Sequence, residues 1–153
     1  MQIVGNRSEN IDLEEFLARP LFAHLATASE YGPRGSPVWF LWEEDALWII
    51  AVLDENTFQE RIRQDPRCTV SIVDFDCETG LVQHIGSRGR ATLEPWDFNK
   101  AKRLLARYLG DDETDWDRGR FLENLDDPDI HSFVKLEPET AVVRDQSYNP
   151  SSK

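Results

Sequence analysis

The sequence predicts a mainly β fold, a small β-barrel with peripheral helices packed outside it. About six segments carry the apolar patterns of strands, and most are joined by short turns. The length of 153 residues fits one domain, and the 40% hydrophobic and 30% charged content is typical of globular proteins. We expect a single domain over residues 1–145, followed by a polar tail over residues 146–153.

The first half of the chain predicts one helix and three strands. The segment "NIDLEEFLAR" has an apolar stripe, a capping residue in Asn10 or Asp12, and Pro20 after its end. Turns rich in glycine, proline or acidic residues separate the strand segments that follow. These three segments are "LFAHLATA", "SPVWFLW" and "ALWIIAVL".

The second half predicts two or three helices and three or four strands. "DENTFQERIRQDP" reads as a helix capped by Asp54 or Asn56, and "EPWDFNKAKRLLARYLG" has clear helical periodicity. The acidic stretch 111–129 is expected to hold another helix near "RGRFLENL". The strand segments are "RCTVSIVDF", "LVQHIGSRGRATL" and "HSFVKLEPETAVVRD", of which the last gives one or two strands. Glycine inside the second of these indicates a bulge or a close approach of other atoms.

The strand "SPVWFLW" is apolar on both faces. Val38, Phe40 and Trp42 share one face, and Trp39 and Leu41 share the other. Both faces must therefore be covered. We expect one face to fill the barrel and the other to form an interface or the wall of a ligand pocket.

The charge of the chain excludes several classes of partner. A net charge of −12 argues against nucleic acid and against an anionic membrane surface. No apolar run approaches the roughly 18 residues of a membrane span, and the N-terminus lacks the layout of a signal peptide. We expect a cytoplasmic protein with free Cys68 and Cys77 that binds a small molecule.

No motif of a metal site, a hydrolase or a nucleotide-binding loop is present. The three histidines lie far apart in the sequence, so we expect no metal site. One strand does carry cations, because His84, Gly86, Arg88 and Arg90 alternate onto one face. This row is either a phosphate or carboxylate site, or a pair of exposed arginines that balance the acidic surface.

An ordered set of segments resembles the pyridoxamine 5′-phosphate oxidase-like family. The set is "FLARPLFAHLATA", "GPRGSPVWFLWEEDALWI", "RIRQDPRCTVSIVD" and "RGRATLE", within residues 12 to 110. The resemblance implies a six-stranded antiparallel Greek-key split β-barrel. It also implies a homodimer with FMN at the subunit interface.

The same resemblance implies the positions of the cofactor contacts. The strand around residues 36–41 would run beside the flavin ring, the end of the next strand would line it, and His84 would lie close to it. A turn and helix start would face the phosphate. The residues implied are Pro37, Val38, Trp39, Phe40, Ile50, Ala51, Asn56 and Thr57.

Phe58 stands where many family members have a lysine that contacts the phosphate. Loss of one charge-assisted hydrogen bond costs roughly 1.5–3 kcal/mol unless another group replaces it. Replacement could come from Arg61 or Arg63 one turn later, or from Arg88 or Arg90. The family also includes members that use a deazaflavin or haem, and members with no cofactor.

Two functions follow from this resemblance. The first is an FMN-dependent oxidoreductase acting on an unknown small molecule. The second is a non-catalytic flavin-, deazaflavin- or haem-binding protein, in which His24, His84 or His131 would be the axial ligand of haem. Vitamin B6 oxidation is not predicted, because Trp116 and Arg118 or Arg120 match only loosely the C-terminal region that completes the oxidase site.

Overall fold

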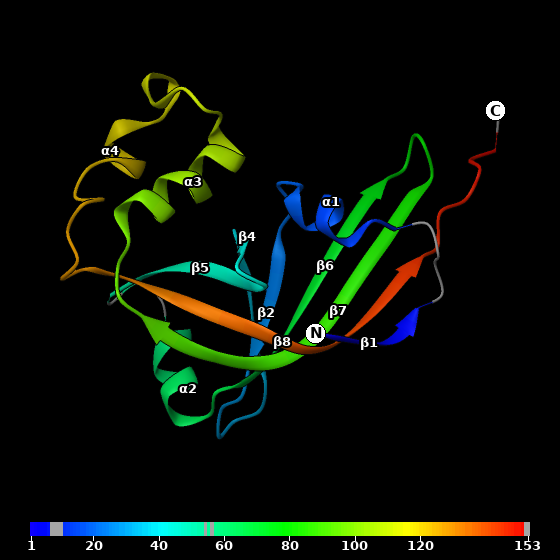
Figure 1. Cartoon of the computed structure of the whole chain (residues 1–153), viewed down its shortest axis with the longest axis horizontal. Helices are drawn as coiled ribbons and strands as arrows, with labels where there is room; N and C mark the ends of the chain where they lie inside the picture. Colours follow the sequence, from blue (N-terminus) through cyan, green and yellow to red (C-terminus); the bar gives the residue numbers. More distant parts are fainter. Residues whose placement is uncertain (7–10, 54, 56, 152–153) are drawn as a thin grey trace.

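A computed structural model shows one strongly curved sheet with helices around it (Figure 1). It describes residues 1–6, 11–53, 55 and 57–151. The strands are β1 (Gln2–Asn6), β2 (Ala23–Thr27), β3 (Arg34–Val38), β4 (Leu41–Glu43), β5 (Ala46–Val52), β6 (Arg67–Asp76), β7 (Leu81–Glu94) and β8 (His131–Asp145). The helices are α1 (Leu13–Ala18), α2 (Phe58–Gln64), α3 (Phe98–Leu109), the 3₁₀ turn η1 (Glu113–Asp115) and α4 (Arg118–Phe121).

The strand order explains the barrel shape. The sheet runs β3-β2-β6-β7-β8-β5-β4, and β1 pairs with β8 outside this path. The two end strands, β3 and β4, are consecutive in the chain and are joined by Trp39 and Phe40 alone. The sheet must therefore curl until its ends meet, which leaves a split between β3 and β4–β5. The predicted mainly β fold with peripheral helices is confirmed.

The sheet has eight strands among the described residues, where the sequence predicted six. One addition is β1, a short strand that pairs in parallel with β8. The other arises because the predicted strand 36–42 is divided into β3 and β4. At the division, the Phe40 backbone N–H donates to the Tyr108 hydroxyl at 3.0 Å instead of to a strand. The last segment forms one continuous strand, β8.

The N-termini of α1 and α3 are capped by side chains, as the capping rules predict. Asp12 accepts from the Glu15 N–H at 3.1 Å and caps α1, and Asp97 caps α3 in the same way. The other predicted caps, Asn10, Asp54 and Asn56, lie outside the described residues. Thr57 is the N-cap of α2 but makes no side-chain capping bond. The predicted helix within residues 111–129 is present as the short η1 and α4.

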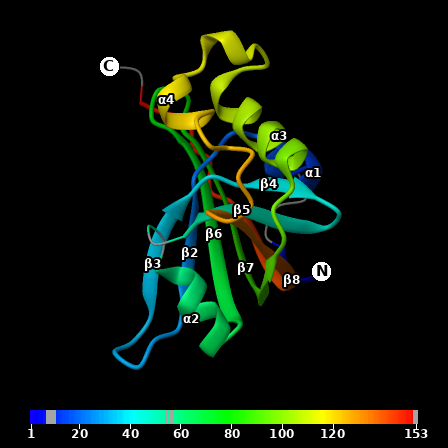
Figure 2. The same cartoon turned by 90° about the vertical axis from the view of Figure 1, so that its left-hand side faces the viewer.

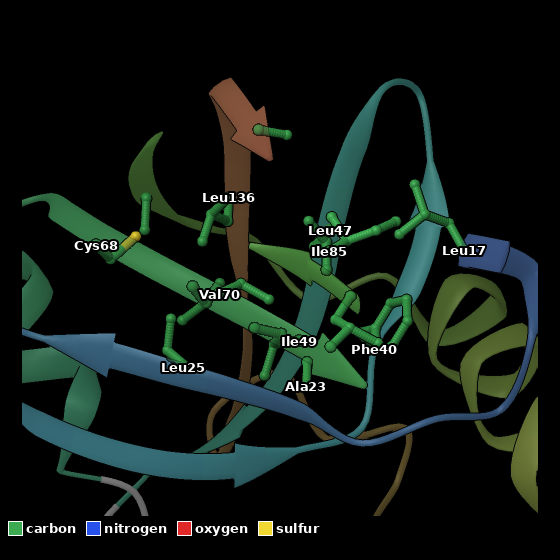
Figure 3. Packing of buried hydrophobic residues seen from close by; sticks show 14 of the residues in the cluster. Leu17, Ala23, Leu25, Phe40, Leu47, Ile49, Cys68, Val70, Ile85 and Leu136 are labelled. Carbon is green, nitrogen blue, oxygen red and sulfur yellow. The ribbon is translucent and has the colours of Figure 1, made fainter. Parts of the chain in front are cut away.

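The barrel interior holds the larger hydrophobic core. Its side chains converge from β2, β5, β6, β7 and β8 (Figure 3), and residues of α1 and α2 pack against them. Phe40, Leu25 and Leu136 are among the members that are completely buried. This core positions the strands and therefore the edges of the split.

A second core lies outside the barrel, beneath α3 and α4. Leu104, Leu105, Trp116 and Leu125 pack there against Trp48 and its neighbours on the outer face of the sheet. Figure 2 shows α3 and α4 at one end of the barrel and α2 at the other. The predicted strand "SPVWFLW" thus has one face in each core: Phe40 faces the barrel, whereas Trp39 and Leu41 face the helices. Helices of the same chain pack on the second face, for which an interface or the wall of a ligand pocket was expected.

Gly89 lies at a bulge between β7 and β8, as glycine within this strand predicted. The register shifts there, so that Arg88 pairs with Thr140 and Gly89 with Pro138. A Cβ atom on residue 89 would overlap the carbonyl group of Glu137. Glycine is therefore required by the close approach of the neighbouring backbone.

The predicted polar tail starts alongside β7. The backbone N–H groups of Gln146 and Tyr148 donate to the carbonyl oxygens of Val82 and Gly80 at 2.8 and 2.9 Å. None of the described helices is long and apolar enough to cross a membrane.

Candidate functional site

A cleft of about 400 Å³ lies in the split of the barrel, and we call it the split cleft. One wall is the end of β3, the opposite wall is β5, the start of α2 closes one side, and α3 with the α4 region forms the cover. The lining residues are Pro37, Val38, Trp39, Ile49, Ile50, Val52, Glu55, Phe58, Leu104, Leu105, Arg120, Phe121, Leu125 and His131. The structure therefore brings four of the predicted ring contacts together: Pro37, Val38, Trp39 and Ile50.

The wall formed by β3 offers main-chain hydrogen-bonding groups. Because β3 ends the strand path, it pairs with β2 along one edge, and no other described strand pairs with its second edge. Backbone N–H and C=O groups on such an edge are available to a ligand. A flat, polar-edged molecule fits this combination of a main-chain edge and an apolar opposite wall.

Trp39 is held in place by two aromatic rings. It stacks on Tyr108 with ring centroids 4.5 Å apart and on Phe121 at 5.8 Å. The Tyr108 hydroxyl accepts from the Phe40 N–H and donates to the Leu21 carbonyl oxygen at 2.8 Å. These contacts connect α3 and α4 to the β3–β4 junction, so this wall of the split cleft is preorganised.

His131 is a polar group with a defined tautomer in the split cleft. Its Nδ1 lies 3.0 Å from the carbonyl oxygen of Asp127, which can only accept. Nδ1 therefore carries a proton, and in a neutral ring Nε2 would carry the lone pair. The ring also stacks on Trp96 at 4.6 Å, which fixes its orientation. Glu55 and Arg120 are the charged residues of the lining.

Phe40 and Ala51, the other two predicted ring contacts, do not line the split cleft. Both side chains are completely buried in the barrel core. Phe58 is also buried, at 4% exposure, and its ring belongs to this core at the floor of the split cleft. A lysine side chain at position 58 would have to leave this apolar environment to reach a phosphate.

Arg61 lies one turn beyond the start of α2, where the resemblance placed the phosphate, and it lines neither the split cleft nor the cavity described next. Its Nε donates to Thr27 Oγ1 at 2.7 Å, and one terminal nitrogen donates to Thr57 Oγ1 at 2.8 Å. Partial burial, together with the positive charge of Arg34, lowers the pKa of Arg61. Two guanidinium groups close together favour an anion between them. Asn56, the other predicted phosphate contact, lies outside the described residues.

Arg88 and Arg90 line a different cavity, of about 610 Å³, which we call the arginine pocket. It lies between the β2–β3 turn, the start of β6 and the bulge of β7 and β8. Its lining residues are Ala26, Thr27, Ala28, Ser29, Gly32, Pro33, Arg67, Cys68, Thr69, Arg88, Gly89, Arg90 and Glu139. The arginine pocket and the split cleft share no lining residue.

His84 lines neither cavity. Its Nε2 lies 3.0 Å from the Ser71 hydroxyl on the neighbouring strand β6. Burial, and secondly the positive charge of Arg144, lower the pKa of His84. The neutral ring can therefore accept a hydrogen bond from Ser71. Within the described part of the chain, no group of three metal-binding side chains is close enough to hold an ion.

The chain is similar to known proteins in sequence and in structure. The sequence model of pyridoxamine 5′-phosphate oxidase matches residues 11–143. The chain belongs to the pyridoxamine 5′-phosphate oxidase family. No curated protein matches its sequence.

Solved structures of other members of this fold are similar over most of the chain. An F420 reductase is 21% identical, with 84% of this chain and 94% of the reductase covered and a TM-score of 0.62. An FAD-binding protein from Mesorhizobium loti is 20% identical, with 90% and 96% covered and a TM-score of 0.61. The haem storage protein HutZ from Vibrio cholerae is 14% identical, with 88% and 93% covered and a TM-score of 0.64. At these identities the likeness shows the fold.

The three C-terminal residues that loosely match the oxidase, Trp116, Arg118 and Arg120, have different surroundings. Trp116 is buried beneath α3, and its Nε1 donates to the Gly110 carbonyl oxygen at 2.8 Å, so it is a packing residue. Arg118 and Arg120 are both exposed, and Arg120 lines the split cleft. Sequence reasoning missed the contributions of Tyr108, Phe121 and the other helical residues to the cleft. Their helical periodicity was visible, but not which strands the helices would cover.

Proposed function

We propose that the protein binds FMN with the ring in the split cleft and acts as an oxidoreductase on a small organic molecule. The observation that carries this proposal is the edge of β3 that pairs with no described strand and faces an apolar wall, in the split of a barrel from this family. The similar folds of an FAD-binding protein and an F420 reductase support a flavin-type ligand. FMN supplies the redox chemistry when bound, and the protein supplies its position and electrostatic environment.

In this proposal, backbone groups of residues 37–39 bond the polar edge of the ring. Ile50 and Val52 pack against its apolar part, and Trp39 fixes the wall on which the ring rests. Arg61 and Arg34 neutralise the phosphate in place of the missing lysine at position 58. Arg61 suits this role because Thr27 and Thr57 already hold its guanidinium group in one orientation.

The proposal includes a cytoplasmic homodimer. Two exposed apolar side chains on the outer face of β6 support dimerisation: Val73 is 44% and Phe75 is 60% exposed. Paired apolar residues of this kind are common where another surface covers them. Light scattering of the purified protein tests this part, and a monomer at all concentrations contradicts it.

FMN titration of the purified protein tests the flavin proposal. We expect Arg61→Gln to weaken FMN binding by about tenfold or more, because a charge-assisted contact is lost. Arg63→Gln is the matched control, since Arg63 lies on the exposed side of the same helix and pairs with Glu60. Equal weakening by both variants, or by neither, contradicts the assignment. Failure of the wild-type protein to bind FMN contradicts the function itself.

The second candidate is a non-catalytic haem-binding protein, and His131 is the observation that favours it. In a neutral ring its Nε2 would carry the lone pair, and the Asp127 carbonyl oxygen bonds Nδ1, as the hydrogen-bond partners of metal-bound histidines do. Haemin titration with His131→Ala and, as control, His24→Ala separates this candidate from the first. Loss of the Soret change in His131→Ala alone supports haem binding, and unchanged spectra in both variants contradict it.

A further inference from the structure

We propose that the arginine pocket is a second binding site, specific for a small organic anion with an apolar body and a phosphate or carboxylate head. The pocket is distinct from the split cleft, because the two cavities have no lining residue in common. Its volume of about 610 Å³ is in the range of small-molecule sites, roughly 300–1,000 Å³. The flavin proposal places no part of the cofactor in this cavity, and the two proposed sites adjoin only through the bond between Arg61 and Thr27.

The charge pattern of the pocket favours an anion although the whole chain carries a net charge of −12. Arg67, Arg88 and Arg90 all line it, and Glu139 is the one acidic residue among the lining residues. A local cluster of guanidinium groups binds phosphate and carboxylate because its planar donors match two acceptor oxygens at once.

Arg88 differs from the other two arginines of the pocket in its ion pairing. Arg67 is engaged by Asp65 through two bonds of 2.9 and 2.7 Å, and this pairing lowers the pKa of Asp65 to about 2. Arg90 pairs with Glu139 at 3.5 Å. No ion pair joins Arg88 to any described residue, and it projects from the exposed face of β7 opposite Thr69 and Thr140.

The remaining walls suit an apolar body. Ala26, Ala28 and Pro33 form the side made by the β2–β3 turn, and the thiol of Cys68 lies beneath them. Burial raises the pKa of Cys68 to about 12, so the thiol stays neutral and adds apolar surface rather than a second anion. Gly89 opens the bulge that places Arg88 and Arg90 at the rim.

Calorimetric titration with phenyl phosphate tests this site, with benzoate as the carboxylate arm and inorganic phosphate as the arm without an apolar body. We expect saturable binding of phenyl phosphate or benzoate, and clearly weaker binding of inorganic phosphate. Arg88→Gln should weaken binding of the organic anion by about tenfold or more. Arg63→Gln, the control on the exposed side of α2, should leave that affinity unchanged.

Several outcomes overturn the proposal. These are equal affinities of the wild type and Arg88→Gln, equal binding of inorganic phosphate and phenyl phosphate, or an equal loss of affinity in Arg88→Gln and the control Arg63→Gln. Loss of FMN binding in Arg88→Gln would show that Arg88 belongs to the flavin site instead. If the protein binds no FMN but phenyl phosphate binds and depends on Arg88, the flavin proposal fails and this one stands.

Discussion

Replacing Tyr108 by phenylalanine tests how the wall of the split cleft is held. The change keeps the ring that stacks on Trp39 and removes only the hydroxyl group. That hydroxyl accepts from the Phe40 N–H at 3.0 Å and donates to the Leu21 carbonyl oxygen at 2.8 Å. Both backbone groups lie in a packed region and would lose this partner.

We expect Tyr108→Phe to lower the free energy of unfolding by about 1–3 kcal/mol, the cost of leaving buried polar groups without a hydrogen bond. Urea denaturation measures this change from the midpoint at constant slope. Tyr148→Phe is the control, because the Tyr148 side chain is half exposed near the C-terminus. A loss below about 0.5 kcal/mol, equal to the control, would refute the reasoning, because surface substitutions have effects of that size.

The same variant gives a pH test. Burial, which outweighs the opposing effects of Phe40 and Arg107, raises the pKa of Tyr108 above its ordinary value of about 10. The protonated phenol therefore stabilises the fold fully below that value, and this contribution is lost as the pH rises through the folded-state pKa. The stability difference between the wild type and Tyr108→Phe should shrink above about pH 10. A constant difference across this range contradicts the proposed burial.

Three further predictions concern the barrel. Gly89→Ala should destabilise the protein by about 3 kcal/mol or more, because the methyl group would overlap the backbone of Glu137. The control Gly35→Ala places its methyl group in open space, so thermal denaturation should show it to be nearly neutral. Phe58→Lys should lower the free energy of unfolding by about 3 kcal/mol or more and should not tighten FMN binding, because the Phe58 ring is buried in the core. Unchanged stability in urea together with tighter binding in an FMN titration would contradict this. His84 should titrate below its ordinary pKa of 6.5 in an NMR experiment, because burial disfavours its charged form. Its neutral form then stabilises the fold above that value, stability falls as the pH drops through the folded-state pKa, and a value of 6.5 or higher would contradict the assigned environment.

The strands were predictable where side-chain alternation and turn residues agree. The alternation in "RCTVSIVDF" and the glycine within the next strand correctly indicated β6 and the bulge at Gly89. The division of the predicted strand "SPVWFLW" at Phe40 was not predictable, because it depends on the hydroxyl group of Tyr108, which is distant in the sequence. Strand β1 was missed because its stability comes from pairing with β8, which local pattern does not reveal.

The candidate site was partly predictable from the sequence. The resemblance indicated Pro37, Val38, Trp39 and Ile50, which line one cleft together. It did not separate the split cleft from the arginine pocket, because the alternation of side chains along a strand gives the face on which a residue lies but not its spatial neighbours. The cover provided by the helices required knowledge of which sheet face they pack against, and that is a tertiary property.

The visible absorption spectrum of the protein purified without added cofactor tests the central claim most directly. The account predicts the two absorption bands of an oxidised flavin, and release of FMN when the protein is denatured. A colourless protein that gains no such bands on titration with FMN would contradict a flavin site in the split of the barrel.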